Sequence, residues 1–260
     1  MTIADIISDK KTRLAQEQIL VPKPEMKQRA AETERIPLDL RDALKRPGLA
    51  LVGPILKASP LTQCSHYDFS PVEVARTEQR AGAAALMVAT EKTFYQGQES
   101  FIGDIRERTR VPIILYDFIL EDYQIYAALA LGADAVVLNA EILDADMLTR
   151  FAALANQLGM QAVVEVHTAE QTERALISGA GIYLIRNLDF NCTGSSELTK
   201  TLAPMIPAGD TVISWGGLKT AENLEQAASW GADAACPPMK LFETDPNIGA
   251  SARGWRPEKH

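Results

Sequence analysis

The sequence predicts an α/β fold of the (β/α)8 TIM-barrel type, preceded by an N-terminal helical extension. Eight apolar segments alternate strictly with helical segments between residue 49 and about residue 245. The apolar segments run continuously instead of alternating with polar residues, which is typical of parallel strands buried on both faces. An open doubly wound sheet is the alternative, but no glycine-rich dinucleotide fingerprint follows the first apolar segment.

An internal repeat supports the barrel. Each copy contains a helix end closed by glycine, then a small residue and an apolar strand, because glycine adopts the left-handed conformation of a helix C-terminus without steric cost. The copies begin about 50 residues apart, which is the length of two strand–helix units. They occupy residues 80–90, 131–141, 178–188 and 230–240.

The other four strands are expected within residues 49–56, 111–118, 160–167 and 210–218. Helical patterns separate the strands, and several of them begin at Ser, Thr or Asp, which cap free amides. These patterns cover residues 70–80, 100–109, 122–131, 144–158, 168–177, 195–206 and 220–230. We expect a helical extension over residues 1–48, the barrel over residues 49–250 and a C-terminal tail over residues 251–260.

Composition excludes several classes of partner. The formal net charge of -8 disfavours nucleic acid and anionic membranes, and no apolar run approaches the length of a membrane span. The three cysteines, Cys64, Cys192 and Cys236, are far apart and lack metal-ligand spacing, which indicates a reducing cytoplasm. The expectation is a cytoplasmic monomer that needs no cofactor or metal and binds a small planar aromatic molecule.

Several motifs, in this order and spacing, resemble those of the indole-3-glycerol phosphate synthase family. They are KASP (57–60), EKTFYQGQ (91–98), DFILEDYQIY (117–126), LGADAVVL (131–138), LGMQAVVEVH (158–167) and TLAPMIPAG (201–209). The family cyclises and decarboxylates an anilino-deoxyribulose phosphate on a TIM barrel. The resemblance covers nearly the whole chain and implies that fold, with an active site at the C-terminal ends of the strands.

At those strand ends the sequence departs from the family pattern. The resemblance implies a Glu and an acid Lys at the positions of Pro54 and Leu56, and a substrate-contacting Lys at Tyr116. The phosphate-gripping end of the last strand reads Pro237-Pro238, and proline has no N–H to donate. Glu165 is the one ionisable residue that remains in an expected inward position, and Gly217 keeps its family identity at the phosphate site. The resemblance therefore implies that native synthase activity is lost.

A different chemistry is then predicted for this site, which lacks the family's catalytic lysines. Glu165 is a carboxylate among apolar groups, so its pKa should rise, and it would act as a base that removes a proton from carbon. The substrate would be a planar aromatic ring, as in Kemp elimination of a benzisoxazole, and the plan resembles that of engineered Kemp eliminases built on this barrel. Tyr116 would donate a hydrogen bond to developing negative charge. The expected lining residues are Pro54, Leu56, Met87, Ala89, Asn139, Leu184, Leu188 and Trp215.

Three alternatives stay open from the sequence. Arg186 either pairs with Glu165 and lowers its pKa, points to the rim to bind the substrate, or is a satisfied polar group. Lys240 at the barrel mouth would allow retro-aldol chemistry through a Schiff base if it were desolvated. The chain could also be a non-catalytic barrel that binds an apolar or aromatic ligand.

Overall fold

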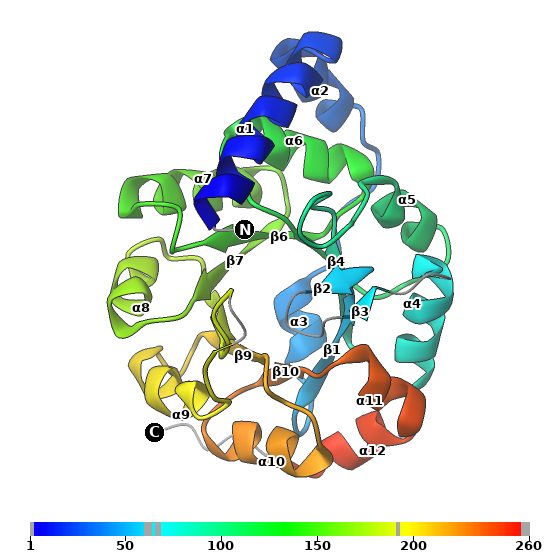
Figure 1. The fold of residues 1–260 in the computed structure, drawn as a ribbon, viewed down its shortest axis with the longest axis vertical. Coiled ribbons are helices and arrows are strands. Elements are labelled where there is room, and N and C mark those ends of the chain that lie inside the picture. The colour runs from blue at the N-terminus through cyan, green and yellow to red at the C-terminus, as the bar shows by residue number, and fades with distance from the viewer. Residues whose placement is uncertain (1–2, 60–63, 66–68, 191–192, 256–260) are drawn as a thin grey trace.

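A computed structural model describes residues 3–59, 64–65, 69–190 and 193–255 of the chain. Eight parallel strands close into a barrel with helices around its outside, as viewed along the barrel in Figure 1. Around the barrel the strands are β1 (Ala50–Ile55), β10 (Ala234–Cys236), β9 (Thr211–Trp215), β8 (Ile182–Arg186), β7 (Gln161–Val166), β6 (Ala135–Asn139), β5 (Ile113–Tyr116) and β4 (Ala85–Ala89). The predicted (β/α)8 barrel is confirmed.

Helices follow the strands in the predicted alternation. They are α4 (Pro71–Arg80), α5 (Ser100–Arg106), α6 (Asp122–Leu131), α7 (Ala145–Gln157), α8 (Ala169–Leu176), α9 (Leu198–Leu202) with the 3-10 turn η1 (Ala203–Met205), α10 (Ala221–Ser229), α11 (Met239–Thr244) and α12 (Ile248–Ala252). A short antiparallel pair, β2 (Ala58–Ser59) and β3 (Cys64–Ser65), lies outside the barrel and was not predicted.

The local signals read from the sequence act as predicted. Ser70, Asp144, Thr168 and Thr220 cap α4, α7, α8 and α10 through their side chains. In the repeat, Gly132 ends α6 with a φ of 95°. That left-handed conformation strains residues with a Cβ, so the repeat needs glycine there.

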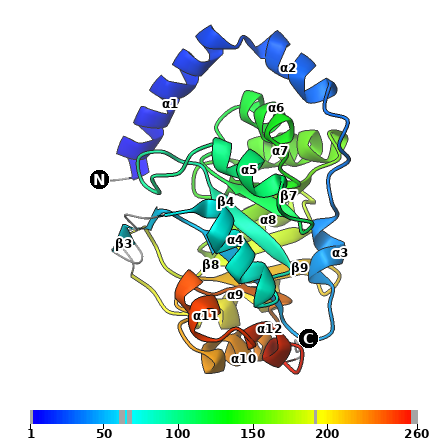
Figure 2. The ribbon, with the colours of Figure 1, turned by 90° about the vertical axis from the view of Figure 1, so that its right-hand side faces the viewer.

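Three helices precede the first strand: α1 (Ile3–Leu20), α2 (Lys23–Ala31) and α3 (Leu40–Leu44). Figure 2 shows α1 and α3 at opposite ends of the barrel. At the C-terminal ends of the strands, Lys10 of α1 forms a 2.9 Å ion pair with Asp117, which follows β5. Close by, Thr93 donates to Asp9 and accepts from Arg13. These contacts hold α1 against the end of the barrel where a family active site is expected.

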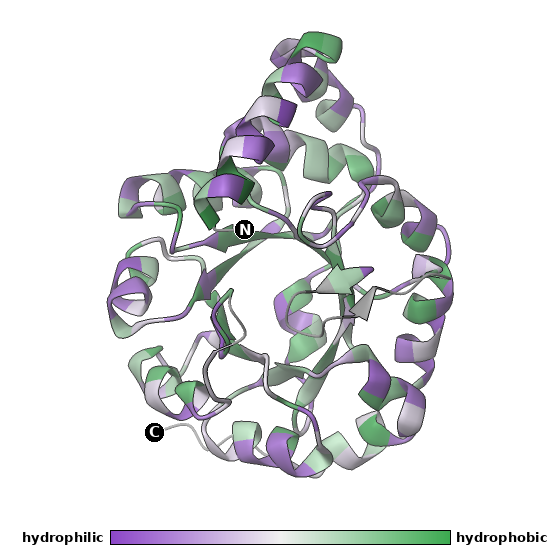
Figure 3. Ribbon diagram, in the orientation of Figure 1, coloured by the Kyte–Doolittle hydropathy of each residue, from purple (hydrophilic) through white to green (hydrophobic). Residues whose placement is uncertain are grey.

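Apolar side chains form two layers, and the strands are predominantly hydrophobic in Figure 3. The outer layer lies between strands and helices. The second layer, here called the inner cluster, fills the barrel and includes Leu40 and Leu44 of α3, which close its N-terminal end. Its other members are Ala50, Val52, Ala84, Ala85, Met87, Ala89, Tyr95, Ile114, Tyr116, Ala135, Val137, Val163, Ile182, Leu184, Ile213, Trp215, Ala234 and Cys236. Alternate residues of each strand supply these layers because successive strand side chains point to opposite faces.

Among the described helices, none combines the length and the apolar composition that a membrane crossing requires. Cys236 is a buried free thiol. The other cysteine predictions concern Cys192 and the Cys64 side chain, which lie outside the described residues.

Candidate functional site

Glu165 is the centre of a buried polar network inside the barrel mouth. Its side chain is only 1% exposed. Tyr116 donates to its Oε2 atom at 2.8 Å, and Asn139 donates to its Oε1 atom at 2.6 Å. Arg186 Nε contacts the same Oε1 atom at 2.9 Å. The four side chains come from the adjacent strands β5 to β8, whose C-terminal ends the barrel brings together.

The guanidinium group of Arg186 contacts three hydrogen-bond acceptors and one aromatic ring. Besides Glu165, its guanidinium donates to Glu141 Oε2 at 2.7 Å and to the carbonyl of Leu188 at 2.8 Å. Its guanidinium carbon also lies 4.0 Å from the ring centroid of Phe190, a cation–π arrangement. Of the alternatives left open by the sequence, the structure therefore selects the ion pair.

Burial and charge act in opposite directions on this pair. Burial raises the pKa of Glu165, while Arg186 and the Tyr116 hydroxyl oppose that rise. Burial alone would lower the pKa of Arg186, but Glu165 keeps it above its ordinary value. The net shift of the Glu165 pKa is upward, as predicted from the sequence, but the carboxylate is paired with the cationic Arg186 and is not the unpaired base that was predicted.

Aromatic rings surround the carboxylate. Tyr116 packs edge-on against Trp215 at 4.9 Å between centroids and against Tyr95 at 5.3 Å. The Tyr95 hydroxyl donates to the Tyr116 hydroxyl at 3.3 Å, so two hydroxyls and the Glu165 carboxylate form a continuous hydrogen-bonded chain. Burial raises the pKa of both tyrosines, which keeps the hydroxyls protonated as donors.

The remaining predicted lining residues are grouped around this network. Met87, Ala89 and Leu184 belong to the inner cluster, and Leu56 packs against it. Pro54 lies opposite Met87 in the pairing of β1 with β4. Leu188 follows β8 and contributes its carbonyl to Arg186. Their roles in substrate binding stay predictions.

Four further residues of the site were missed by sequence reasoning. Tyr95 and Phe94 stand in the loop after β4, which Glu91 holds by accepting from three backbone amides. Glu141 and Phe190 contact Arg186 from two other loops. A signal existed for Phe94 and Tyr95, since both lie in the EKTFYQGQ motif. Glu141 and Phe190 reach the site only because their loops bend over the barrel mouth.

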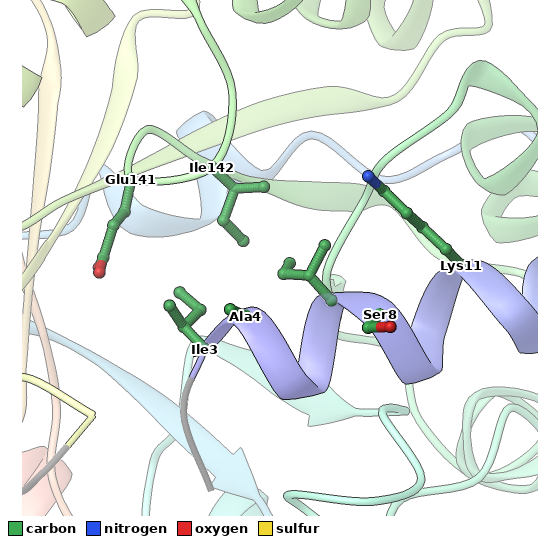
Figure 4. A pocket seen from close by; sticks show the side chains of 7 residues that line it. Ile3, Ala4, Ser8, Lys11, Glu141 and Ile142 are labelled. Atoms are coloured by element: carbon green, nitrogen blue, oxygen red, sulfur yellow. The ribbon is translucent and has the colours of Figure 1, made fainter.

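A cavity adjoins the network on the side of α1. Its volume is about 360 Å³, and Figure 4 shows Glu141 and Ile142 facing Ile3 and Ala4 across it. Glu141 therefore lies between this cavity and Arg186. The other lining residues are Ile7, Ser8 and Lys11.

Two other residues near the C-terminal ends of the strands, His167 and Lys240, are not part of the Glu165 network. His167 Nδ1 lies 2.6 Å from the carbonyl oxygen of Arg186, so the imidazole is hydrogen-bonded to the backbone of β8. Lys240 is exposed on α11. Because the side chain of Lys240 is exposed, it lacks the desolvation that a Schiff-base lysine requires. In the described residues, no group of three or more His, Cys, Asp or Glu side chains is arranged to hold a metal ion.

Solved structures with low sequence identity share the barrel fold. One is a mandelate oxidase with benzoyl-formic acid, at a TM-score of 0.61 and 15% identity, covering 85% of this chain and 81% of that chain. Another is the N-acetylmannosamine-6-phosphate 2-epimerase of Clostridium perfringens, at a TM-score of 0.56 and 18% identity, covering 78% of this chain and 95% of that chain. At such identities the likeness concerns the fold alone.

Sequence relatives are much more similar. The indole-3-glycerol phosphate synthase of Roseiflexus castenholzii is 36% identical over 258 residues, covering 95% of each chain. That of Alkaliphilus metalliredigens is 31% identical over 257 residues, covering 98% of each chain. The similarity thus extends from the N-terminal helices to the end of the barrel.

These relatives overturn the prediction that native synthase activity is lost. Full-length relatives at 31–36% identity all bear the name of the synthase, which supports the family's own function for this chain. The predicted Kemp elimination, the non-catalytic binding barrel and the Lys240 retro-aldolase all depended on that loss, and they are wrong with it. The prediction failed because it treated each changed strand end as a lost function, whereas the strand ends here form a connected polar network around Glu165.

The family model of indole-3-glycerol phosphate synthase matches residues 3–236, which include α1 and all eight strands of the barrel. Together with the full-length relatives, this match shows that the chain belongs to the indole-3-glycerol phosphate synthase family.

Proposed function

We propose that this chain catalyses the decarboxylative ring closure for which its relatives are named. The substrate would be an anilino-deoxyribulose phosphate whose aromatic ring carries a carboxylate, and the product an indole with a phosphorylated side chain. The observation that carries the proposal is the Glu165 network. It lies at the C-terminal ends of β5 to β8, where the active site of this fold is expected.

The reaction defines what the site must do. An aromatic carbon adds to the ketone carbon of the sugar, a C–C bond forms, and carbon dioxide and water leave, with no change in overall oxidation state. The ketone oxygen needs a proton donor as it becomes a hydroxyl and departs. Positive charge develops on the anilino nitrogen, which needs a nearby anion to stabilise it and to accept its proton.

Glu165 and Tyr116 fit these two requirements. The Glu165 carboxylate supplies the anion, and Arg186 and Asn139 fix its orientation. Tyr116 occupies the position where the resemblance implies a lysine, and its hydroxyl is a buried donor backed by Tyr95. With substrate bound, the Tyr116 hydroxyl would turn its proton from Glu165 to the ketone oxygen and replace the ammonium group as the donor.

The apolar surroundings suit the rest of this substrate. Trp215 and Tyr116 offer ring faces and edges to an aniline ring. For the phosphate we propose the loop after β9, where Gly216 and Gly217 have φ values of 93° and 73°. Glycine lets a backbone approach an anion closely.

The proposal is tested by incubating the purified chain with the anilino-deoxyribulose phosphate and following indole fluorescence. We expect turnover by the wild type and a fall in kcat of about 100-fold or more in Glu165→Gln, the range for a proton-transfer group. The matched control is Glu170→Gln on α8, whose side chain is 86% exposed, and it should retain full activity. Absence of indole formation by the wild-type chain would refute the proposal.

A further inference from the structure

A second cavity lies at the N-terminal end of the barrel, opposite the candidate site. Its volume is about 340 Å³. It lies where the segment between α3 and β1, the end of α4 and the end of α12 meet; Figure 2 shows α3 and α12 on this side. The lining residues are Arg46, Pro47, Leu49, Ala50, Leu51, Gln79, Arg80, Gly82, Ala83, Ala84, Val111, Gly249 and Arg253.

Among the residues that the structure describes, the charged residues that line this cavity are three arginines. Arg46 precedes β1, Arg80 ends α4 and Arg253 follows α12, so three segments distant in sequence each contribute one guanidinium. All three residues are exposed, and within the described part of the chain none of them forms an ion pair. The cavity therefore carries concentrated positive charge in a chain whose net charge is -8.

Another arginine cluster in the same molecule shows the contrast. Arg35 and Arg106 converge on the buried carboxylate of Asp134, which neutralises them. In contrast, no carboxylate accompanies the three arginines among the described residues that line the N-terminal cavity. Like charges that gather around a concave surface repel one another, and an anion that enters the cavity removes that repulsion.

The three segments are held rigidly relative to one another. Gly249 of α12 donates to the carbonyl of Ala81 at 3.0 Å, and Leu49 donates to the carbonyl of Ala252 at 2.9 Å. A Cβ added to Gly82 would lie 3.0 Å from the Gly249 Cα atom, so the backbones are in close contact. Because the cavity is preformed, little free energy is lost in ordering the protein when a ligand binds.

The uncharged part of the lining indicates what else the ligand carries. Leu49, Leu51 and Val111, with three alanines, form the apolar part of the cavity wall. Guanidinium groups bind phosphate and carboxylate through paired hydrogen bonds. The volume falls in the lower part of the range for small-molecule sites.

We propose that this cavity is a second binding site, separate from the candidate active site, for a small organic anion. The ligand carries a phosphate or carboxylate group that contacts Arg46, Arg80 and Arg253 and an apolar body that packs on Leu49, Leu51 and Val111.

Calorimetric titration with phenyl phosphate tests the proposal. We compare the wild type with the triple variant R46M/R80M/R253M and with the control R150M, which removes an exposed arginine of α7. We expect the triple variant to lose one equivalent of phenyl phosphate binding, or to weaken it at least tenfold. The control should bind as the wild type does. Binding to the wild type should also weaken as salt is raised.

Two further titrations identify the ligand class. Benzoate distinguishes carboxylate from phosphate, and inorganic phosphate lacks the apolar body, so it should bind at least tenfold more weakly than phenyl phosphate. Equal binding of inorganic phosphate would contradict the role of the apolar walls. Identical isotherms for the wild type and a folded triple variant would overturn the proposal, as would absence of binding to the wild type. If the triple variant unfolds, the single variant R80M replaces it under the same criteria.

Discussion

The ion pair between Glu165 and Arg186 is the main feature of the candidate site at the scale of single residues. Both side chains are at most 2% exposed, and each has a second polar partner: Tyr116 donates to Glu165, and Arg186 donates to Glu141. A buried ion pair contributes little net stability by itself, but removal of one partner leaves an uncompensated charge. The ion pair therefore fixes the position of the carboxylate, and the folded state depends on both partners being present.

Substitution of Arg186 by methionine tests whether the folded state depends on this ion pair. R186M leaves Glu165 and Glu141 without their cation, so the free energy of unfolding should fall by about 3–5 kcal/mol at pH 7. Urea unfolding followed by far-UV circular dichroism measures the change. The control is R29M, which breaks an exposed pair with Glu25 and should cost less than about 1 kcal/mol. Equal effects of the two substitutions would show that Arg186 does not stabilise the network.

Substitution of Tyr116 by phenylalanine tests the proposed donor. Y116F keeps the ring that packs on Trp215 but removes the hydroxyl, so kcat for indole formation should fall about 100-fold with a much smaller change in KM. Y126F removes a tyrosine hydroxyl from α6, outside the site, and should leave kcat unchanged. A Y116F enzyme with wild-type kcat would exclude the hydroxyl as the donor.

Helix α4 carries an unusual group at the scale of single elements. Glu78 is 1% exposed, and within the described residues neither of its carboxyl oxygens has a hydrogen-bond partner. It faces β1 at Gly53, where an added Cβ would meet Glu78 Oε2 at 2.2 Å. Glycine on β1 is thus what gives the carboxyl group room. Burial, with a smaller contribution from Glu243, raises the pKa of Glu78 well above its ordinary value.

This raised pKa predicts a pH-dependent stability. Below the ordinary pKa of glutamate, Glu78 is protonated in both the folded and the unfolded chain and costs nothing. As pH rises from there towards the raised folded-state pKa, only the unfolded chain ionises, so stability is lost. In E78Q, the free energy of unfolding should therefore decline less between pH 5 and pH 8 than in the wild type. E73Q, an exposed change on the same helix, should keep the wild-type pH dependence. A parallel decline in E78Q and wild type would contradict the assignment.

At the scale of the whole molecule, the barrel interior joins segments from the entire chain. Leu44 of α3 belongs to the same inner cluster as Trp215 of β9, although the two residues lie at opposite ends of the barrel. Such a shared core predicts that unfolding is cooperative and that damage at one end lowers the stability of the other.

The substitution L44A tests this cooperativity. Leu44 is 1% exposed, so its truncation should lower the free energy of unfolding by about 2–5 kcal/mol. Tryptophan fluorescence and far-UV circular dichroism should report the same lowered urea midpoint. I36A truncates a residue that is 85% exposed and should change stability by less than about 0.5 kcal/mol. Separate midpoints for the two probes would show that the barrel ends unfold independently.

The sequence alone determined the fold, because its signals are local. Apolar runs, capping residues such as Ser70 and the helix-ending Gly132 each act within a few residues, and together they specified eight strand–helix units. The position of Glu165 at the end of a strand followed from the resemblance of its motif to that of the family.

Only the tertiary structure decided what surrounds that carboxylate. Arg186 was open to three interpretations from the sequence, and Glu141 and Phe190 carried no signal, because their contacts depend on how loops bend across the barrel mouth. The arginines of the N-terminal cavity come from three segments that meet only in the closed barrel. Long-range contacts such as these depend on chain closure and not on local preference, which is why the sequence determined the scaffold and the folded molecule determined the chemistry.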